Sequence, residues 1–143
     1  MTPKENAMKI IRLLLLFLLL AAPARLSAQN QGTVAKPNES PEELAAKTAD
    51  QLMTYLGLDD RQVYQVDSTL QSVYTQLFAQ IEAVRKSGAT NDESYLLVSD
   101  RWGAVIDSTF RCIFNDRQWK LYLKTPSGKE KKARDKRMAR RAR

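Results

Sequence analysis

The strongest pattern in this sequence is a run of aliphatic residues that recur every three or four positions through about six helical turns. Its members are Val63, Val66, Leu70, Val73, Leu77, Ile81 and Val84. A stripe with this period lies along one face of an α-helix, and other helices must cover it. No stretch of the chain alternates with period two for long enough to indicate a strand. The sequence therefore predicts an all-α fold.

Capping residues and glycines mark where the helices begin and end. The segment Ser40-Pro41-Glu42-Glu43 combines a capping serine, a proline suited to the first helical position and a glutamate that can reach back. Gly57 and Gly88 end the first two helices. Further helices are expected from about residue 91, from residue 114 and, with Ser127 as its cap, in the basic C-terminal segment. We expect a small four-helix bundle or cradle of antiparallel helices with a basic C-terminal helical tail.

The N-terminal segment has the layout of a secretory signal peptide. A basic stretch at residues 8–12 precedes an apolar run that reaches Ala22, and Ala28 offers a small residue at the cleavage position. The apolar run is shorter than the ~20 residues that a spanning helix needs, so we favour cleavage near Ala28 over an uncleaved membrane anchor. This predicts an exported, periplasmic protein. Its parts would be a signal peptide at 1–28, a flexible leader at 29–39, a helical domain at 40–124 and a basic tail at 125–143.

The residue inventory argues against catalysis. There is no His, which excludes Ser-His-Asp and Cys-His catalysis and His-ligated zinc. A single Cys cannot form a thiolate metal site or a Cys-x-x-Cys redox pair. We therefore expect no enzyme, and no catalytic, cofactor-binding or metal-binding residue. Cys112 lies near the apolar stripe of its helix and is expected to be buried, whereas an exposed thiol could link two chains.

Two short motifs occur twice. Leu58-Asp59-Asp60-Arg61-Gln62 corresponds in residue type to Phe114-Asn115-Asp116-Arg117-Gln118. Val66-Asp67-Ser68-Thr69-Leu70 corresponds to Ile106-Asp107-Ser108-Thr109-Phe110, and an Asp-Arg pair precedes each copy at the same distance. The first motif is explained as a capped helix start in which the glutamine reaches back, and its loss should cost on the order of 1 kcal/mol. The second is explained as a helix face with chance identity.

The first motif also resembles a known one. An apolar residue followed four positions later by Gln, twice at helix starts in a short exported chain, is similar to the LTXXQ-motif family of periplasmic stress proteins (Spy/CpxP-like). The resemblance covers about residues 41–124. It implies a four-helix cradle, often a homodimer, that binds unfolded or partly folded envelope proteins without ATP or acts as a stress-pathway adaptor. The matching residues are Leu58 and Phe114, Gln62 and Gln118, with Asp59 and Asn115 in place of the motif's threonine.

These observations lead to two hypotheses about function. In the first, the chain is a chaperone-like or stress-adaptor protein that binds apolar segments of other envelope proteins. Tyr74 and Phe78, which lie beside the main stripe of their helix, are the candidate client-binding residues. Alternatively, these two residues complete a larger core or a dimer seam.

In the second hypothesis, the chain binds a membrane surface or another polyanion through its basic tail. Residues 29–123 carry 9 basic and 13 acidic side chains, whereas residues 124–143 carry 10 basic and 2 acidic ones. Such a run attracts anions electrostatically or is simply solvated, and export disfavours nucleic acid as the partner. High salt should weaken binding by the tail and spare apolar binding. The candidate anion-binding residues are Lys131, Lys132, Arg134, Lys136, Arg137, Arg140 and Arg141.

Overall fold

The computed structural model describes residues 39–143, which form five α-helices and no strand. The helices are α2 (Pro41–Leu56), α3 (Asp60–Lys86), α4 (Asp92–Ile113), α5 (Asp116–Tyr122) and α6 (Pro126–Arg141). The prediction of an all-α fold is confirmed. The expected signal peptide and nearly all of the expected leader lie outside the described residues. Each helix within residues 39–143 is too short or too polar to cross a membrane.

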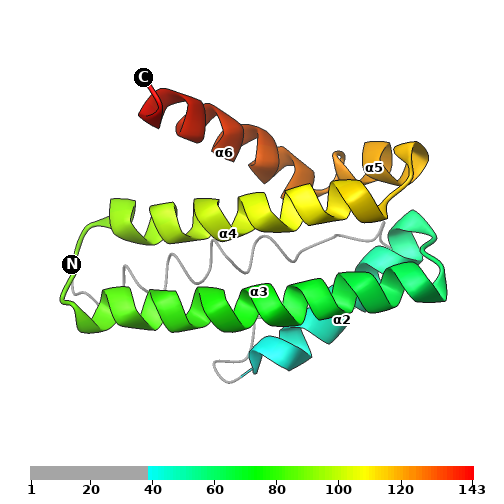
Figure 1. Ribbon diagram of the computed structural model, residues 1–143, viewed down its shortest axis with the longest axis horizontal. Coiled ribbons are helices and arrows are strands. Elements are labelled where there is room, and N and C mark those ends of the chain that lie inside the picture. The colour runs from blue at the N-terminus through cyan, green and yellow to red at the C-terminus, as the bar shows by residue number, and fades with distance from the viewer. Residues whose placement is uncertain (1–38) are drawn as a thin grey trace, which may run out of the picture.

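The two longest helices, α3 and α4, form an antiparallel hairpin (Figure 1). α2 packs against α3 on one side of this hairpin, and α6 runs along α4 on the other. The short helix α5 lies at the end of the hairpin where α4 stops and where α2 turns into α3. The first helix and the last helix therefore flank the hairpin on opposite sides.

The predicted aliphatic stripe of α3 forms the centre of the core. Its middle members Val66, Leu70, Val73 and Leu77 are at most 4% exposed. Burial of side chains of this size is the main favourable contribution to folding, worth about 1.5 to 3 kcal/mol each. The same core includes three aromatic rings whose centroids lie 5.1 to 5.7 Å apart. These rings belong to Phe110, Phe114 and Tyr122.

Local capping explains where the helices begin. Ser40 and Glu43 bond each other's backbone N–H groups at the start of α2, which is a complete capping box. The cap of α6 is Thr125, not Ser127 as the sequence predicted. Thr125 Oγ1 accepts the N–H of Gly128 at 3.2 Å. Pro126 takes the first helical position and keeps the residue before it extended, which places the cap directly before the proline.

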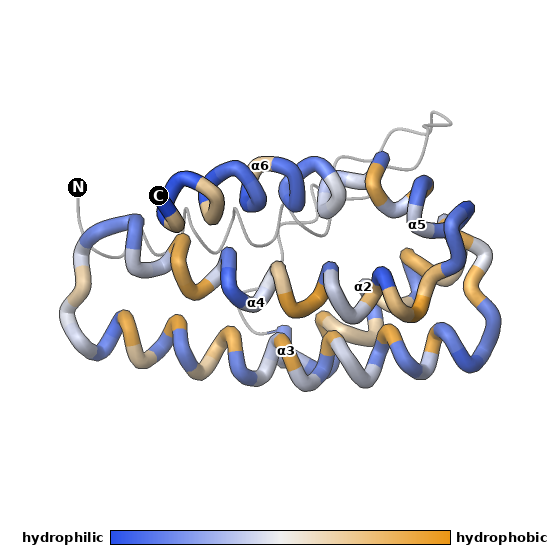
Figure 2. The backbone as a smooth tube through the Cα atoms, turned by 45° about the horizontal axis from the view of Figure 1, so that its top comes forward, coloured by the Kyte–Doolittle hydropathy of each residue, from blue (hydrophilic) through white to orange (hydrophobic). Residues whose placement is uncertain are grey.

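The last helix differs from the others in composition. Figure 2 shows α6 as hydrophilic along most of its length, whereas hydrophobic and hydrophilic residues alternate along α3 and α4. α6 therefore cannot be held in place mainly by buried apolar side chains. Its attachment to α4 depends on charged groups.

Candidate functional site

The two copies of the first motif are far apart in the sequence and meet in space. Gln62 is at the start of α3 and Gln118 is at the start of α5. Gln62 Nε2 donates to Gln118 Oε1 at 2.8 Å, and Gln118 Nε2 donates to Gln62 Oε1 at 2.9 Å. Each Oε1 also accepts the backbone N–H of its own cap residue, at 3.2 Å for Asp59 and 3.0 Å for Asn115. The two helix starts are thus joined into one pseudosymmetric unit.

The remaining amide protons of this pair close the ends of two further helices. Gln62 Nε2 donates to the carbonyl of Ile113 at 2.9 Å, and Gln118 Nε2 donates to the carbonyl of Gly57 at 3.2 Å. Helix C-termini leave carbonyl groups without partners, so these bonds replace water there. The glutamine pair therefore ties together the ends of α2, α3, α4 and α5. Its donors and acceptors serve the fold, and it offers no group for a reaction.

The sequence of the second motif indicated no role beyond a helix face. Its copy in α4, however, provides the surface to which α6 binds. Arg134 of α6 is 1% exposed and forms an ion pair with Asp107 of α4. The hydroxyl of Tyr122 donates to the other carboxylate oxygen of Asp107 at 2.8 Å. The guanidinium lies directly over Gly103, where a Cβ atom would overlap it. A buried arginine is tolerated only with such a partner, because an unpaired buried charge is costly.

A second carboxylate of α4 holds the rest of α6. Arg137 donates to both oxygens of Asp100, at 2.7 and 3.0 Å. Arg141 bonds Asp100 at 2.8 Å and Glu93 at 2.9 Å. Bidentate arginine–carboxylate pairs are among the strongest charge-assisted hydrogen bonds. α6 is thus fastened to α4 by three arginines over two helical turns.

The two carboxylates that hold α6 differ in electrostatics. Burial raises the pKa of Asp107, and the neighbouring Arg134 and Tyr122 only partly offset this. Burial also acts to raise the pKa of Asp100, but Arg137 and Arg141 outweigh it and hold that pKa below its ordinary value. Burial and the adjacent carboxylate raise the pKa of Tyr122 well above its usual range, so its hydroxyl remains a donor. The ionised form of Asp100 therefore stabilises the fold, and this contribution is lost when acid protonates it.

These contacts divide the candidate anion-binding residues of the basic tail into two groups. Arg134, Arg137 and Arg141 already pair with carboxylates of α4, and Lys131 pairs with Asp135 on α6 itself. The other three candidates, Lys132, Lys136 and Arg140, are exposed. The spacing of the acidic and basic residues in the sequence could have indicated these pairs. Asp100 and Asp107 are seven residues apart and so share a helix face, as do Arg134 and Arg141.

The candidate client-binding residues of α3 face the core. Tyr74 is 8% exposed, and its ring stacks on that of Phe78 with the centroids 6.3 Å apart. Burial raises the pKa of Tyr74 to about 12. Phe78 is half-buried against the same core. Tyr74 is therefore a core residue, as the alternative interpretation allowed, and its expected exposure to a client is wrong.

Cys112 is exposed, which contradicts the prediction that it is buried. The reason is its angle on α4. Phe110, which is 1% exposed, marks the core side of this helix. Two residues further on, at 100° per residue, the side chain of Cys112 points to the opposite side.

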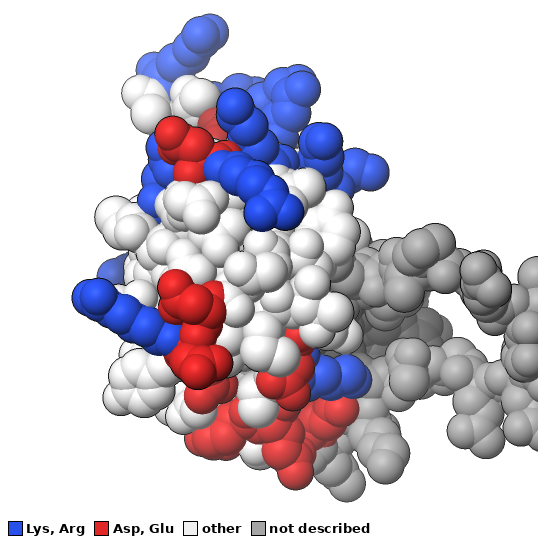
Figure 3. Space-filling view, turned by 90° about the vertical axis from the view of Figure 1, so that its right-hand side faces the viewer, with Lys and Arg blue, Asp and Glu red and all other residues white. Residues whose placement is uncertain are grey.

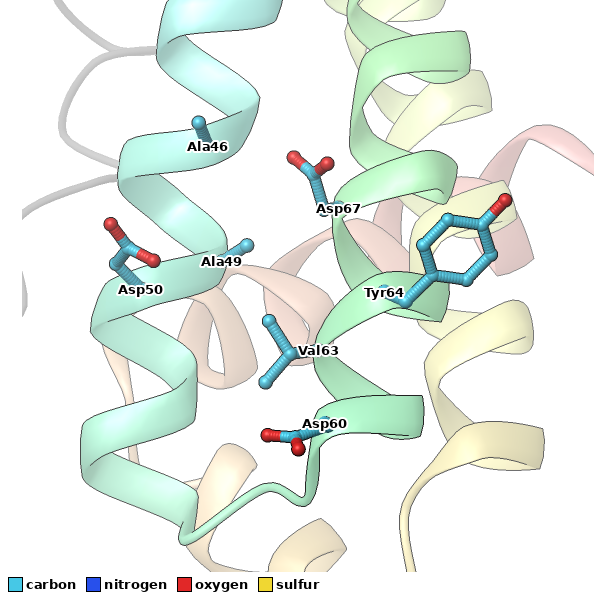
Figure 4. Close-up of a pocket in the computed structure, with 7 residues that line it drawn as sticks. All are labelled: Ala46, Ala49, Asp50, Asp60, Val63, Tyr64 and Asp67. Atoms are coloured by element: carbon cyan, nitrogen blue, oxygen red, sulfur yellow. The ribbon is translucent and has the colours of Figure 1, made fainter.

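A hollow that the sequence analysis did not predict opens between α2 and α3. Its volume is about 380 Å³. Figure 4 shows Val63, Asp60 and Asp67 of α3 pointing toward α2. Tyr64, on the same helix, also contributes to the lining, and its side chain, 73% exposed, points away from α2 (Figure 4). We call this hollow the α2–α3 groove; its lining residues are Ala46, Ala49, Asp50, Asp60, Val63, Tyr64 and Asp67.

The groove combines an apolar floor with a rim of carboxylates. Ala49 and Val63 lie between the two helices (Figure 4). Asp67 Oδ2 accepts the side-chain N–H of Gln71 at 2.7 Å, while the buried Oδ1 has no hydrogen-bond partner in the described part of the chain. Such a surface suits an apolar group flanked by hydrogen-bond donors or positive charges.

Within residues 39–143, no three His, Cys, Asp or Glu side chains come together in a way that could hold a metal ion. The sequence contains the residues of the groove, but the groove itself depends on how closely α2 approaches α3. No protein-family model, no curated protein and no solved structure matches the chain.

Proposed function

We propose that this chain is an exported, ATP-independent binding protein of the chaperone-like or stress-adaptor type, which holds apolar segments of other envelope proteins. The observation that carries the proposal is the α2–α3 groove, with the exposed side chain of Tyr64 beside it on α3. The resemblance of the two glutamine motifs to the LTXXQ-motif family supports the same function. Gln62 and Gln118 hold the turn between α2 and α3 in place, and this turn closes one end of the groove.

The lining of the groove favours clients with an apolar side chain next to Lys or Arg. Contact with the apolar floor contributes roughly 25 cal/mol per Å² buried and is not directional, so many different side chains can bind. Tyr64 lies one helical turn from Asp60 and one from Asp67. A client cation can pair with these two carboxylates. Such weak and adaptable contacts need no ATP.

The test is suppression of aggregation of a denatured client without nucleotide. Tyr64→Ser removes the exposed ring, and Ala46→Gln, at an exposed position of the lining, occupies the groove with a polar side chain. Both variants should stay folded and lose most of the suppression. Tyr55→Ser is the matched control, because Tyr55 is 42% exposed on α2 outside the groove. Equal loss in the Tyr55 variant, or no loss in either groove variant, would remove the groove from the proposal.

The location of the protein is part of the same proposal and rests on the N-terminal segment. Export with cleavage gives a mature protein that begins at Gln29. N-terminal sequencing of the protein from native cells tests this. Recovery of chains that retain Met8 in a membrane fraction would show that the segment is an anchor.

A further inference from the structure

The cations of α6 are divided between two opposite faces of the helix. The arginines that pair with α4 occupy the inner face. On the outer face, basic residues recur at steps of three or four positions, so they form one line along the helix. All five are exposed, and none of their side chains has an ion pair or hydrogen bond to another described residue. We call this line the outer stripe; it consists of Lys129, Lys132, Lys136, Arg140 and Arg143.

The outer stripe is held in a fixed position. The inner arginines fasten α6 to α4, so the outer cations are not carried on a free tail. At 1.5 Å per residue the part of the stripe that lies within α6, from Lys129 to Arg140, is straight and ~16 Å long, and Arg143 follows just beyond the helix. α6 is the outermost element on its side of the hairpin (Figure 1). A flat surface can therefore approach all the cations of the outer stripe together.

Charge is separated across the whole molecule. Residues 124–143 carry 10 basic and 2 acidic side chains, whereas residues 39–86 carry 4 basic and 8 acidic ones. Figure 3 shows Lys and Arg gathered at the edge of the molecule where α6 lies, and most Asp and Glu toward the opposite edge. An anionic plane therefore attracts the α6 edge and repels the α2–α3 edge. The anionic plane would therefore fix the orientation of the molecule as well as bind it.

We propose that the outer stripe docks the protein on the anionic surface of a phospholipid bilayer, with the α2–α3 groove facing away from the membrane. Lysine ammonium groups, three of the five cations, bind phosphates as point charges without fixed geometry. The residues next to the stripe are small, Ala133 and Ala139, so α6 rests among the headgroups and does not insert. This role is independent of client binding by the groove.

The composition of α6 favours a bilayer over a nucleic acid. Residues 124–143 contain no aromatic side chain that could stack on a base, and no Asn or Gln that could read a base edge. Export, which the N-terminal segment predicts, also brings the chain to a membrane and takes it away from nucleic acid. Binding to duplex DNA is therefore one of the outcomes that the test must separate.

The test measures partitioning of the protein onto vesicles. Phosphatidylcholine vesicles that contain phosphatidylglycerol are compared with vesicles of phosphatidylcholine alone. The stripe variant carries Lys132→Gln, Lys136→Gln and Arg140→Gln. Each cation near an anionic surface contributes roughly a fivefold factor, so partitioning onto the anionic vesicles should weaken on the order of 100-fold. Binding of the unaltered protein should fall steeply with added salt and be absent on phosphatidylcholine alone.

A matched variant separates the stripe from net charge. Lys47→Gln, Arg61→Gln and Lys86→Gln remove the same number of exposed cations from the α2–α3 side of the molecule. This control should bind anionic vesicles nearly as well as the unaltered protein. All arms keep the same N-terminus, so any contribution of the N-terminal apolar run is equal. Equal weakening in both variants would overturn the proposal, as would stripe-dependent binding to duplex DNA without binding to vesicles.

The orientation is tested with two labelled proteins. In a Cys112→Ser background, a polarity-sensitive fluorophore is attached to Ala139→Cys beside the stripe, or to Asp50→Cys at the groove. Anionic vesicles should shift the emission of the first label and leave the second unchanged. A shift at the groove label alone would show that the wrong face docks.

Discussion

Gln62 and Gln118, 56 positions apart, hold each other's side-chain amides through two hydrogen bonds of 2.8 and 2.9 Å. Each glutamine thereby satisfies the side-chain amide of the other while it caps its own helix, and Gln118 is buried. The repeated motif is then more than two independent helix starts. The two helix starts contact each other through the glutamines. Removal of either glutamine side chain leaves the other without part of its hydrogen bonds.

Gln62→Ala and Gln118→Ala should each lower the free energy of unfolding by about 2 kcal/mol. This exceeds the ~1 kcal/mol expected of a cap alone, because a buried donor and acceptor also lose their partner. The double variant should cost less than the sum of the two single variants. Urea unfolding of all three proteins measures the coupling. Glu43→Ala is the control, because Glu43 closes an exposed capping box on α2 with only local bonds. If Gln118→Ala costs no more than Glu43→Ala, the pairing adds nothing.

Replacing Gly103 by Ala should destabilise the protein, although the same change in an ordinary helix interior stabilises by up to about 1 kcal/mol. The added methyl group would occupy the space of the Arg134 guanidinium, so α6 must shift from α4. We expect a loss of about 2 kcal/mol, typical of an overfilled site, with faster hydrogen exchange in α6. In an Arg134→Ala background the same substitution should be neutral or stabilising. Equal losses in both backgrounds would assign the effect to α4 alone.

Acid should loosen the attachment of α6 through Asp100. Because Arg137 and Arg141 hold the pKa of Asp100 below its ordinary value of 3.8, its carboxylate stabilises the fold above that pH. This contribution is lost as the pH falls through the lower, folded-state pKa. Asp100→Asn should therefore be less stable than the unaltered protein at pH 7, and the difference should narrow below about pH 4. Unfolding curves across this range measure it. A constant difference at all pH values would show that the charge of Asp100 is not involved.

Cys112 should react with a thiol reagent in the folded protein. Its side chain is exposed on α4, so no unfolding step is needed. The rate without denaturant should approach that in urea, and Cys112→Ser should abolish the reaction. Protection that disappears only in urea would show that another chain, or the N-terminal segment, covers this position.

Local sequence determined the helices of this protein and most of their ends. The stripe from Val63 to Val84 indicates one long helix because its period depends only on residues within that helix. The cap at Ser40 depends on atoms within one turn, so a four-residue pattern is enough to predict it. The cap at Thr125 was not predicted, because the capping pattern alone does not include the effect of a proline. Pro126 also decides which residue can be the cap, and Ser127 already lies inside the helix.

Only the tertiary structure decided which polar groups meet and which apolar groups stay exposed. Periodicity gives the angle of a residue around its own helix, but not which neighbouring helix covers that angle. Tyr74 lies at the side of the stripe and is buried, whereas Tyr64, ten residues earlier on the same helix, is exposed. The arginines of α6 look alike in sequence, but Arg134 is buried because Asp107 and Gly103 of another helix receive it. Such pairings depend on the distance between helices, and no single segment of the chain encodes that distance.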